Sequence, residues 1–491
     1  MKSNYIKQIF FAISLLILSS CSDDFLDKKP TEFVDYDAAT KTTEDLMTLL
    51  NGIHRSLYIR YESNQNENGL GSLMQQVDIA ADDLVFPVTN GWFLAVYNWT
   101  GQANENAQDI RFPYRTYYRI IRNANTIIES TDAAVGSDAD KKIVKGQALL
   151  YRAFCHYQLV QLFGKRYVSG TTNTQLGVPL ILTVGNEQFP RSTVEEVYAQ
   201  INKDIDEANV LLVGYTKPNN SHLGLKVAQG LKARVALTQG NWAIAADYAA
   251  KAKAGIALMT PDEYVKGFND FNGKEWMWGS HVSEVQTDYF GNFGAYMSRN
   301  YNSTVIRSCP KAINSKLYNL IPATDVRSKI FDKTGAHTAL GLPSTYAKFP
   351  YTSQKFLAIS TGDSRCDIPY MRVAEMYLIE AEAKARLGLA DANNVLFTLV
   401  KSRDAAYVLS TKTGQALVDE IWFQRRIELW GEGFRFYDLK RTNSALDRTG
   451  ANHDSSVTGG VLSVPASDKR WQWLIPRAEI NANPLVKQNE L

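Results

Sequence analysis

The chain has 491 residues, 45% of them hydrophobic, so it can bury a large core in one domain or in two closely packed lobes. It carries 53 Lys and Arg against 51 Asp and Glu, and two of those lysines fall in the first 20 residues, which hold no acid. A body this close to neutral argues against nucleic-acid binding, which depends on clustered positive charge.

The N-terminus has the pattern of a bacterial lipoprotein signal. Lys2 and Lys7 precede an apolar run from Ile9 to Leu18, which suits a signal sequence and is too short to cross a bilayer. The run leads into Ser19-Ser20-Cys21, and two small residues before a cysteine suit the peptidase that cuts before a lipid-modified thiol. The alternative is an ordinary cleaved signal with a cysteine nearby by chance.

These features predict the domain organisation. Residues 1–20 are expected to be the signal peptide, 21–36 a lipidated tether, and 37–491 a single domain held at the membrane by lipid on Cys21. Lipidation of Cys21 leaves an odd number of other cysteines. Cys155 lies in an apolar helical pattern and is predicted to be buried, whereas pairing between Cys309 and Cys366 stays open because sequence gives no distance.

Helical periodicity dominates the rest of the chain. Apolar residues recur at steps of three and four in segments 43–61, 114–129, 141–163, 193–212, 226–238, 242–257, 370–387 and 390–406. Ser192, with Glu195 three residues later, is the predicted N-cap of the fourth segment, and Gly164 is expected to end the third. The last four segments form two helix–turn–helix pairs that resemble tetratricopeptide repeats, but the pairs lie far apart in the sequence. We therefore predict a mainly α fold, a scaffold with a few such pairs and not a continuous solenoid.

The segment from about 260 to 365 has a different character. Gly, Asn, Ser, Thr and Tyr are abundant there, and it is interrupted by Pro310, Pro322, Pro343 and Pro350. Long irregular segments inside a packed domain are often functional. We expect a loop-rich insertion that supplies the irregular, ligand-binding half of the domain.

Residues 424–441, QRRIELWGEGFRFYDLKR, alternate in charge and interleave with aromatic side chains. One interpretation is a helix that runs into a buried turn held by Arg–carboxylate pairs. The other is a glycosidase-like acid and base at Glu428 and Glu432, although neighbouring carboxylates on one helix do not by themselves make the opposed pair that glycoside hydrolysis needs. The structural interpretation is favoured.

Several stretches together resemble the SusD/RagB-like outer-membrane lipoproteins of Bacteroidetes. The resemblance rests on an ordered set of motifs: CSDDFLD from Cys21, RA at 152–153, GVPL at 177–180, PRST at 190–193, RVAE at 372–375, the Arg-rich run 425–441, and LIP and EINANP near the end.

The resemblance implies a tetratricopeptide-like fold and a non-catalytic protein that captures oligosaccharides at the cell surface. It also implies an outer-membrane location facing the exterior, a TonB-dependent SusC-like transporter as partner, and Asp23-Asp24 as an export signal. No cofactor, metal or nucleic acid is expected, since there is no CxxC pair, HExxH, GxSxG or Walker loop.

Aromatic side chains stack on the apolar faces of sugar rings, so exposed aromatics are the candidate glycan contacts. Two clusters stand out, and for both the alternative is packing in the core. The candidate ligand-binding residues are Trp92, Tyr97, Asn98, Trp99, Tyr289, Phe293, Tyr296 and Tyr301. By contrast, Trp276 and Trp278 alternate as in a strand and are expected to pack.

Three other functions stay open. A peptide-binding lipoprotein of the same architecture would fit the same features. A secreted hydrolase would need carboxylates across a cleft or a nucleophile motif, and a purely helical adaptor would need more helix pairs and a smaller insertion.

Overall fold

The computed structural model describes residues 39–61, 64–286 and 288–491, so the predicted signal peptide, tether and Cys21 lie outside the described residues. The prediction of a mainly α fold is confirmed. The scaffold helices are α3 (Thr43–Ser56), α6 (Gln108–Ser130), α7 (Asp138–Phe163), α8 (Val194–Leu211), α9 (Leu225–Gln239), α10 (Trp242–Lys253), α15 (Val373–Arg386), α16 (Ala392–Arg403) and α17 (Gly414–Glu428).

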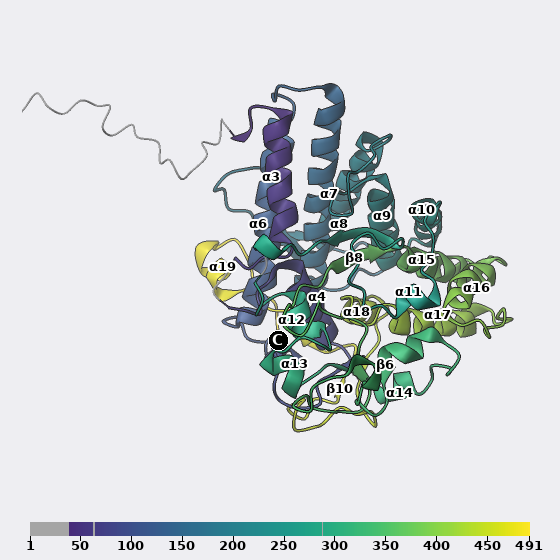
Figure 1. Cartoon of the computed structure of the whole chain (residues 1–491). Helices are drawn as coiled ribbons and strands as arrows, with labels where there is room; N and C mark the ends of the chain where they lie inside the picture. Colours follow the sequence, from purple (N-terminus) through teal and green to yellow (C-terminus); the bar gives the residue numbers. More distant parts are fainter. Residues whose placement is uncertain (1–38, 62–63, 287) are drawn as a thin grey trace, which may run out of the picture.

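These helices form one row of neighbours. Figure 1 shows α3, α7, α8, α9 and α10 side by side across the top of the molecule, and α15, α16 and α17 extend the row at the right. Helix α10 packs directly on α15, although the whole loop-rich segment separates them in the sequence. Ala245, Ala246 and Ala249 of α10 are buried, which allows the close approach of helix backbones. The two predicted helix pairs are therefore adjacent in space.

The remaining helical elements are short. They are α4 (Gly69–Ile79), α5 (Leu94–Tyr97), α11 (Pro261–Tyr264), α12 (Phe293–Met297), α13 (Thr304–Ser308), α14 (Ser315–Tyr318), α18 (Arg435–Arg441) and α19 (Arg477–Ala482), with 3₁₀ turns η2 (Glu284–Gln286), η3 (Val326–Ile330), η4 (Thr338–Leu340) and η5 (Lys469–Trp471). Most of them lie below the scaffold in Figure 1, among long irregular segments.

All the strand pairs are antiparallel and short. One sheet has the order β1 (Leu84–Val85), β5 (Ala312–Ile313), β7 (Thr352–Ser353), β6 (Phe331–Asp332). The two-stranded pairs are β2 (Leu176–Pro179) with β3 (Arg191–Thr193), β4 (Trp276–Ser280) with β8 (Ile368–Arg372), and β9 (Leu446–Asp447) with β10 (Ser463–Val464). The sheet joins residues far apart in the chain, because β1 precedes most of the scaffold helices and its partner lies in the loop-rich segment.

The β4–β8 pair marks where the loop-rich segment leaves the scaffold and returns to it. Trp276 opposes Arg372, and Ser280 opposes Ile368. Trp276 and Trp278 are buried in this pair, as predicted. Because β8 runs through Arg372, α15 begins at Val373 and not at Tyr370 as the periodicity indicated.

The predicted cap of α8 was wrong by one residue. Thr193, not Ser192, is the N-cap, and its side chain accepts from the backbone N–H of Glu196 while Glu196 bonds back to the Thr193 backbone. Both spacings exist in the sequence, and pairing of β3 with β2 holds the backbone extended through Thr193.

Candidate functional site

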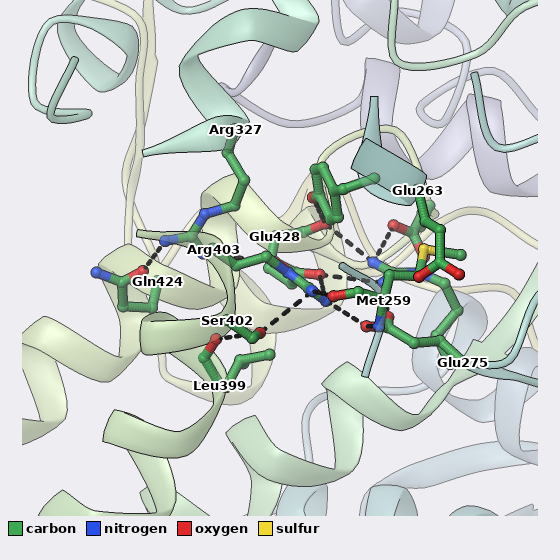
Figure 2. Close-up of polar contacts among 12 residues, drawn as sticks. Met259, Glu263, Glu275, Arg327, Leu399, Ser402, Arg403, Gln424 and Glu428 are labelled. Atoms are coloured by element: carbon green, nitrogen blue, oxygen red, sulfur yellow. Dashed lines mark hydrogen bonds and ion pairs between the residues drawn. The ribbon is translucent and has the colours of Figure 1, made fainter. Parts of the chain in front are cut away.

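A buried cluster of charges joins the ends of three scaffold helices. Arg372 precedes α15, Arg403 ends α16 and Glu428 ends α17. Glu428 Oε1 accepts hydrogen bonds from Arg372 Nη1 at 3.0 Å and from Arg403 Nη2 at 3.1 Å. Figure 2 shows Arg403 bridging Glu428 and Glu275, with Arg327 approaching Glu428 from the loop-rich side. The cluster thereby fastens the scaffold to the irregular half.

The same contacts bear on the acid–base interpretation of Glu428 and Glu432. Burial opposes ionisation of Glu428, but the surrounding guanidinium groups hold its pKa well below the usual range. Burial also acts on Glu432, and Arg372 and Lys355 lower its pKa. Both carboxylates are buried and form ion pairs, so a substrate in solvent cannot reach them. Their lowered pKa values keep them ionised, so neither has a proton to donate. This geometry fits the structural interpretation of residues 424–441.

A second set of acids connects the N-terminal third to that segment. The Asp78 carboxylate accepts the backbone N–H of Gly433 at 2.8 Å and of Phe434 at 3.1 Å. Asp82 pairs with Arg435 at 2.7 Å, and Asp83 pairs with Arg426. These ion pairs therefore attach the beginning of the irregular segment after Asp83 to residues 426–435.

Trp92 lies in this irregular segment and is half-buried. Its ring stacks on that of Tyr296 from α12, with centroids 4.6 Å apart and planes 9° from parallel. Tyr296 Oη donates a hydrogen bond to the Trp92 carbonyl oxygen at 2.8 Å. The two predicted clusters, far apart in sequence, thus meet in this one pair of rings.

The support behind the pair is also built from distant segments. Lys311 Nζ lies 4.1 Å from the centroid of the Tyr296 ring and donates to the Cys309 carbonyl oxygen. Because Trp92 covers one face of Tyr296, the ammonium group occupies the other, as in a cation–π contact. A Cβ on Gly91 would stand 3.0 Å from Tyr296 Oη, so the residue before Trp92 has little room for a side chain.

A hydrogen bond between two polar side chains lies close in sequence to the Trp92–Tyr296 ring pair and its Lys311 support. The exposed Asn90 donates from its amide to the hydroxyl of Ser308 at the end of α13. We call Trp92, Tyr296, Lys311, Asn90 and Ser308 the Trp92 platform. Sequence reasoning missed Lys311, Asn90 and Ser308, since a single Lys, Asn or Ser in a loop carries no signal of which aromatic ring it will meet.

Two aromatic candidates were wrong as ligand contacts, because they have no exposed surface. Tyr97 is buried, stacks on Phe86 and bonds to His453. Trp99 is also buried, and its indole N–H donates to the Ala80 carbonyl oxygen. Their rings contribute to packing.

The remaining candidates differ in how far they are buried. Phe293 is buried against Phe356, and Tyr301 is buried in a small separate cluster, so both were also wrong as exposed stacking residues. Tyr296 is buried too and supports Trp92 in place of facing a ligand. Asn98 and Tyr289 are half-buried and stay predictions as ligand contacts.

The cysteines within the described residues are separate thiols. Cys155 is fully buried, as predicted, and Cys309 and Cys366 are buried without a disulfide between them. In the same part of the chain, no helix combines the length and the apolar character that a membrane crossing requires.

Comparison with known proteins identifies the family. Residues 24–237 match a family model described as "Starch-binding associating with outer membrane", and residues 246–491 match that of the SusD family. The chain belongs to the SusD family. The ordered motifs of the sequence had indicated this family, and the tetratricopeptide-like scaffold agrees with it.

SusD-family relatives match this chain over different lengths. The SusD-like protein P2 of Formosa agariphila is 26% identical over 96% of this chain and 95% of its own. The starch-binding protein SusD of Bacteroides thetaiotaomicron is 33% identical, but over only 30% of this chain and 23% of its own. A SusD-like carbohydrate-binding protein from Bacteroides vulgatus superimposes with a TM-score of 0.81 at 25% identity, covering 92% of this chain and 99% of that one.

Proposed function

We propose that this SusD-family protein binds oligosaccharides on the Trp92 platform and passes them to a TonB-dependent, SusC-like outer-membrane transporter. The observation that carries the proposal is a half-buried tryptophan whose ring is fixed parallel to a buried tyrosine. The described family property, starch binding at the outer membrane, gives the ligand class.

The physical argument concerns the part of the Trp92 side chain that is exposed to solvent. A pyranose ring presents C–H groups on its faces, and these groups pack on the flat surface of an aromatic ring. Stacking on Tyr296 and the Tyr296 hydroxyl hold the indole in one orientation, so little side-chain entropy is lost when a sugar binds. The exposed amide of Asn90 can bond sugar hydroxyl groups beside the ring.

The membrane part of the proposal rests on the N-terminal sequence. Lipid on Cys21 would anchor the protein in the outer membrane, and the tether would place the body on the exterior side, above the transporter. The role is capture and delivery without catalysis, and it requires no cofactor.

Binding is tested by affinity gel electrophoresis of the soluble body from Ser22, against plant, fungal and host polysaccharides. We expect one polysaccharide to retard the wild type, and Trp92→Ala to remove about 1.5–3 kcal/mol of binding free energy, the range for burying one large apolar side chain. Trp92→Phe should retain part of the affinity, because a smaller ring still stacks.

Trp242→Ala is the matched control, since Trp242 is also half-buried but lies on scaffold helix α10. Equal loss of binding in Trp242→Ala and Trp92→Ala would contradict the platform. Retardation by no polysaccharide, with binding of peptides instead, would contradict the glycan assignment. Release of new reducing ends during incubation would contradict a non-catalytic role.

A further inference from the structure

A cavity whose lining includes no residue of the Trp92 platform lies between the scaffold and the C-terminal segment. It has a volume of about 450 Å³ and is lined by the loop after α7, by β2 and β3, by the end of α18 and by residues 466–472 and 488–490. Five cationic and two acidic side chains line it. The protein as a whole is close to neutral, so this charge is local to the cavity.

Two of the cations are buried in the cavity wall. Lys440 Nζ donates to the carbonyl oxygens of Gln161, Gly164 and Trp471, at 2.5 to 2.8 Å, so all three of its N–H groups are directed at carbonyls. Arg191 donates to backbone carbonyls, including that of Gly177 at 2.8 Å. Within the described part of the chain neither side chain forms an ion pair, so their positive charge is held by dipoles and is not cancelled by a carboxylate.

Burial has the expected effect on these groups. It lowers the pKa of Lys440 to about 7 and that of Arg191 to about 10. A carboxylate or other anion nearby would oppose this effect by favouring the charged forms. Every N–H donor of Lys440 and Arg191 is already directed at a protein oxygen. The two groups therefore add positive charge behind the wall, and direct hydrogen bonds to a ligand would come from the other lining residues.

Two further cations stand at the mouth. Lys165 is exposed and Arg166 is half-buried, and neither pairs with an acid among the residues that the structure describes. Both acids of the lining have a cationic neighbour: Asp468 pairs with Arg470 at 2.8 Å, and the exposed Glu490 lies 3.9 Å from Lys469. The mouth thus adds unpaired positive charge to the buried pair.

The rest of the lining suits a polyhydroxylated ligand and not a bare ion. Leu176, Leu439 and Trp471 supply apolar surface, while Asn443 and Ser444 supply polar groups that can bond hydroxyls. The volume exceeds what an inorganic anion needs. We propose that this cavity binds an anionic sugar, a uronic acid or a short oligosaccharide that carries one, with the carboxylate at the Lys165–Arg166 mouth.

Isothermal titration calorimetry of the soluble body from Ser22, at low ionic strength, tests the proposal. The probes are glucuronate, galacturonate, their neutral parent sugars glucose and galactose, and inorganic phosphate and sulfate. We expect a uronate to bind and its parent sugar to bind at least tenfold more weakly, since a charge-assisted hydrogen bond contributes about 1.5–3 kcal/mol and 1.4 kcal/mol is tenfold.

Lys165→Gln/Arg166→Gln should weaken uronate binding by at least about tenfold. Neither side chain forms a hydrogen bond or an ion pair within the part of the chain that the structure describes. We therefore expect the variant and the wild type to unfold at the same urea concentration. The matched control is Lys142→Gln/Lys348→Gln, which removes two exposed charges that do not line the cavity. Binding should persist in Trp92→Ala, which separates this cavity from the platform of the proposed function.

Three results would overturn the inference. One is the absence of uronate binding, and another is uronate binding that the Lys165/Arg166 variant leaves unchanged. The third is a phosphate or sulfate affinity equal to that of the uronates, which would assign the cavity to a free inorganic anion.

Discussion

Trp92 and Trp99 belong to one short segment, yet one faces the surface and the other the core. Phe93 and Trp99 both adopt left-handed backbone conformations, with φ of 61° and 57°, on either side of α5. This conformation costs a non-glycine residue free energy, so it occurs only where contacts with the surrounding structure hold the backbone in place. The two reversals turn Trp99 inward against Ala80 and leave Trp92 stacked on Tyr296.

His453 gives a pH-dependent prediction at the same scale. Burial lowers its pKa to about 4, while its ring bonds the Tyr97 hydroxyl and the Asp82 carbonyl oxygen as a neutral imidazole. Between pH 6.5 and 4 the unfolded chain therefore binds a proton that the folded protein does not. The contribution to stability is complete above about pH 6.5 and is lost as the pH falls toward 4, about 2 kcal/mol of it between pH 7 and pH 5.

Urea unfolding at pH 7 and pH 5 measures this effect. His453→Gln should reduce the difference in unfolding free energy between the two pH values by about 2 kcal/mol. His281→Gln is the control, because His281 is an exposed histidine beside Asp367. An unchanged pH dependence in His453→Gln would show that this imidazole is not held neutral.

At the scale of elements, α6 contains a proline that its sequence pattern placed outside the helix. Periodicity predicted a start at Tyr114, but α6 begins at Gln108 and includes Pro113. Proline has no N–H for the carbonyl one turn earlier. Here Gln76 Nε2, from α4, donates to that carbonyl of Asp109 at 2.5 Å. A long-range side chain thus supplies the missing bond, and no local sequence rule predicts it.

A double-mutant cycle tests this compensation. Gln76→Ala should lower the unfolding free energy by about 1–3 kcal/mol, the cost of leaving a buried carbonyl without a partner plus a small cavity. In a Pro113→Ala background the loss should be smaller by about 1 kcal/mol, because an alanine in place of the proline has an N–H for the Asp109 carbonyl. Equal losses in both backgrounds would mean that Gln76 acts only through packing.

At the scale of the whole molecule, buried ion pairs join segments that are remote in sequence. Arg372 bonds Glu275, Glu428 and Glu432, all within the interior. Removal of one partner from a buried cluster leaves uncompensated charge, which costs about 3–5 kcal/mol. An exposed pair such as Lys251–Asp247 contributes about 0.5 kcal/mol or less.

We therefore expect Arg372→Met to lower the unfolding free energy by about 3–5 kcal/mol and Lys251→Met to change it by less than about 0.5 kcal/mol, both measured by urea unfolding. If Arg372→Met yields no folded protein, Glu275→Gln, a milder change in the same cluster, should still unfold at a lower urea concentration than the wild type. Stability of both cluster variants equal to that of the wild type would contradict the role of the cluster.

Sequence patterns predicted the scaffold well because helical periodicity is local. The predicted end of α7 at Gly164 and the two helix pairs matched, with boundary shifts of a few residues. The platform was predicted only in part. Trp92 and Tyr296 were both candidates, but their contact depends on the path of long irregular segments, as does the burial of Tyr97 and Trp99. Composition cannot distinguish an aromatic ring in the core from one at the surface.

The β4–β8 pair has a consequence for how this half of the molecule can vary. Ser280 and Ile368 lie opposite each other, so residues 281–367 leave and re-enter the scaffold at one narrow neck. The entropy of closing a loop grows only with the logarithm of its length, and doubling the length costs about 0.6 kcal/mol. Insertions and deletions within residues 281–367 therefore change the free energy of loop closure only slightly. We therefore expect this segment to tolerate changes in length while the row of helices stays the same.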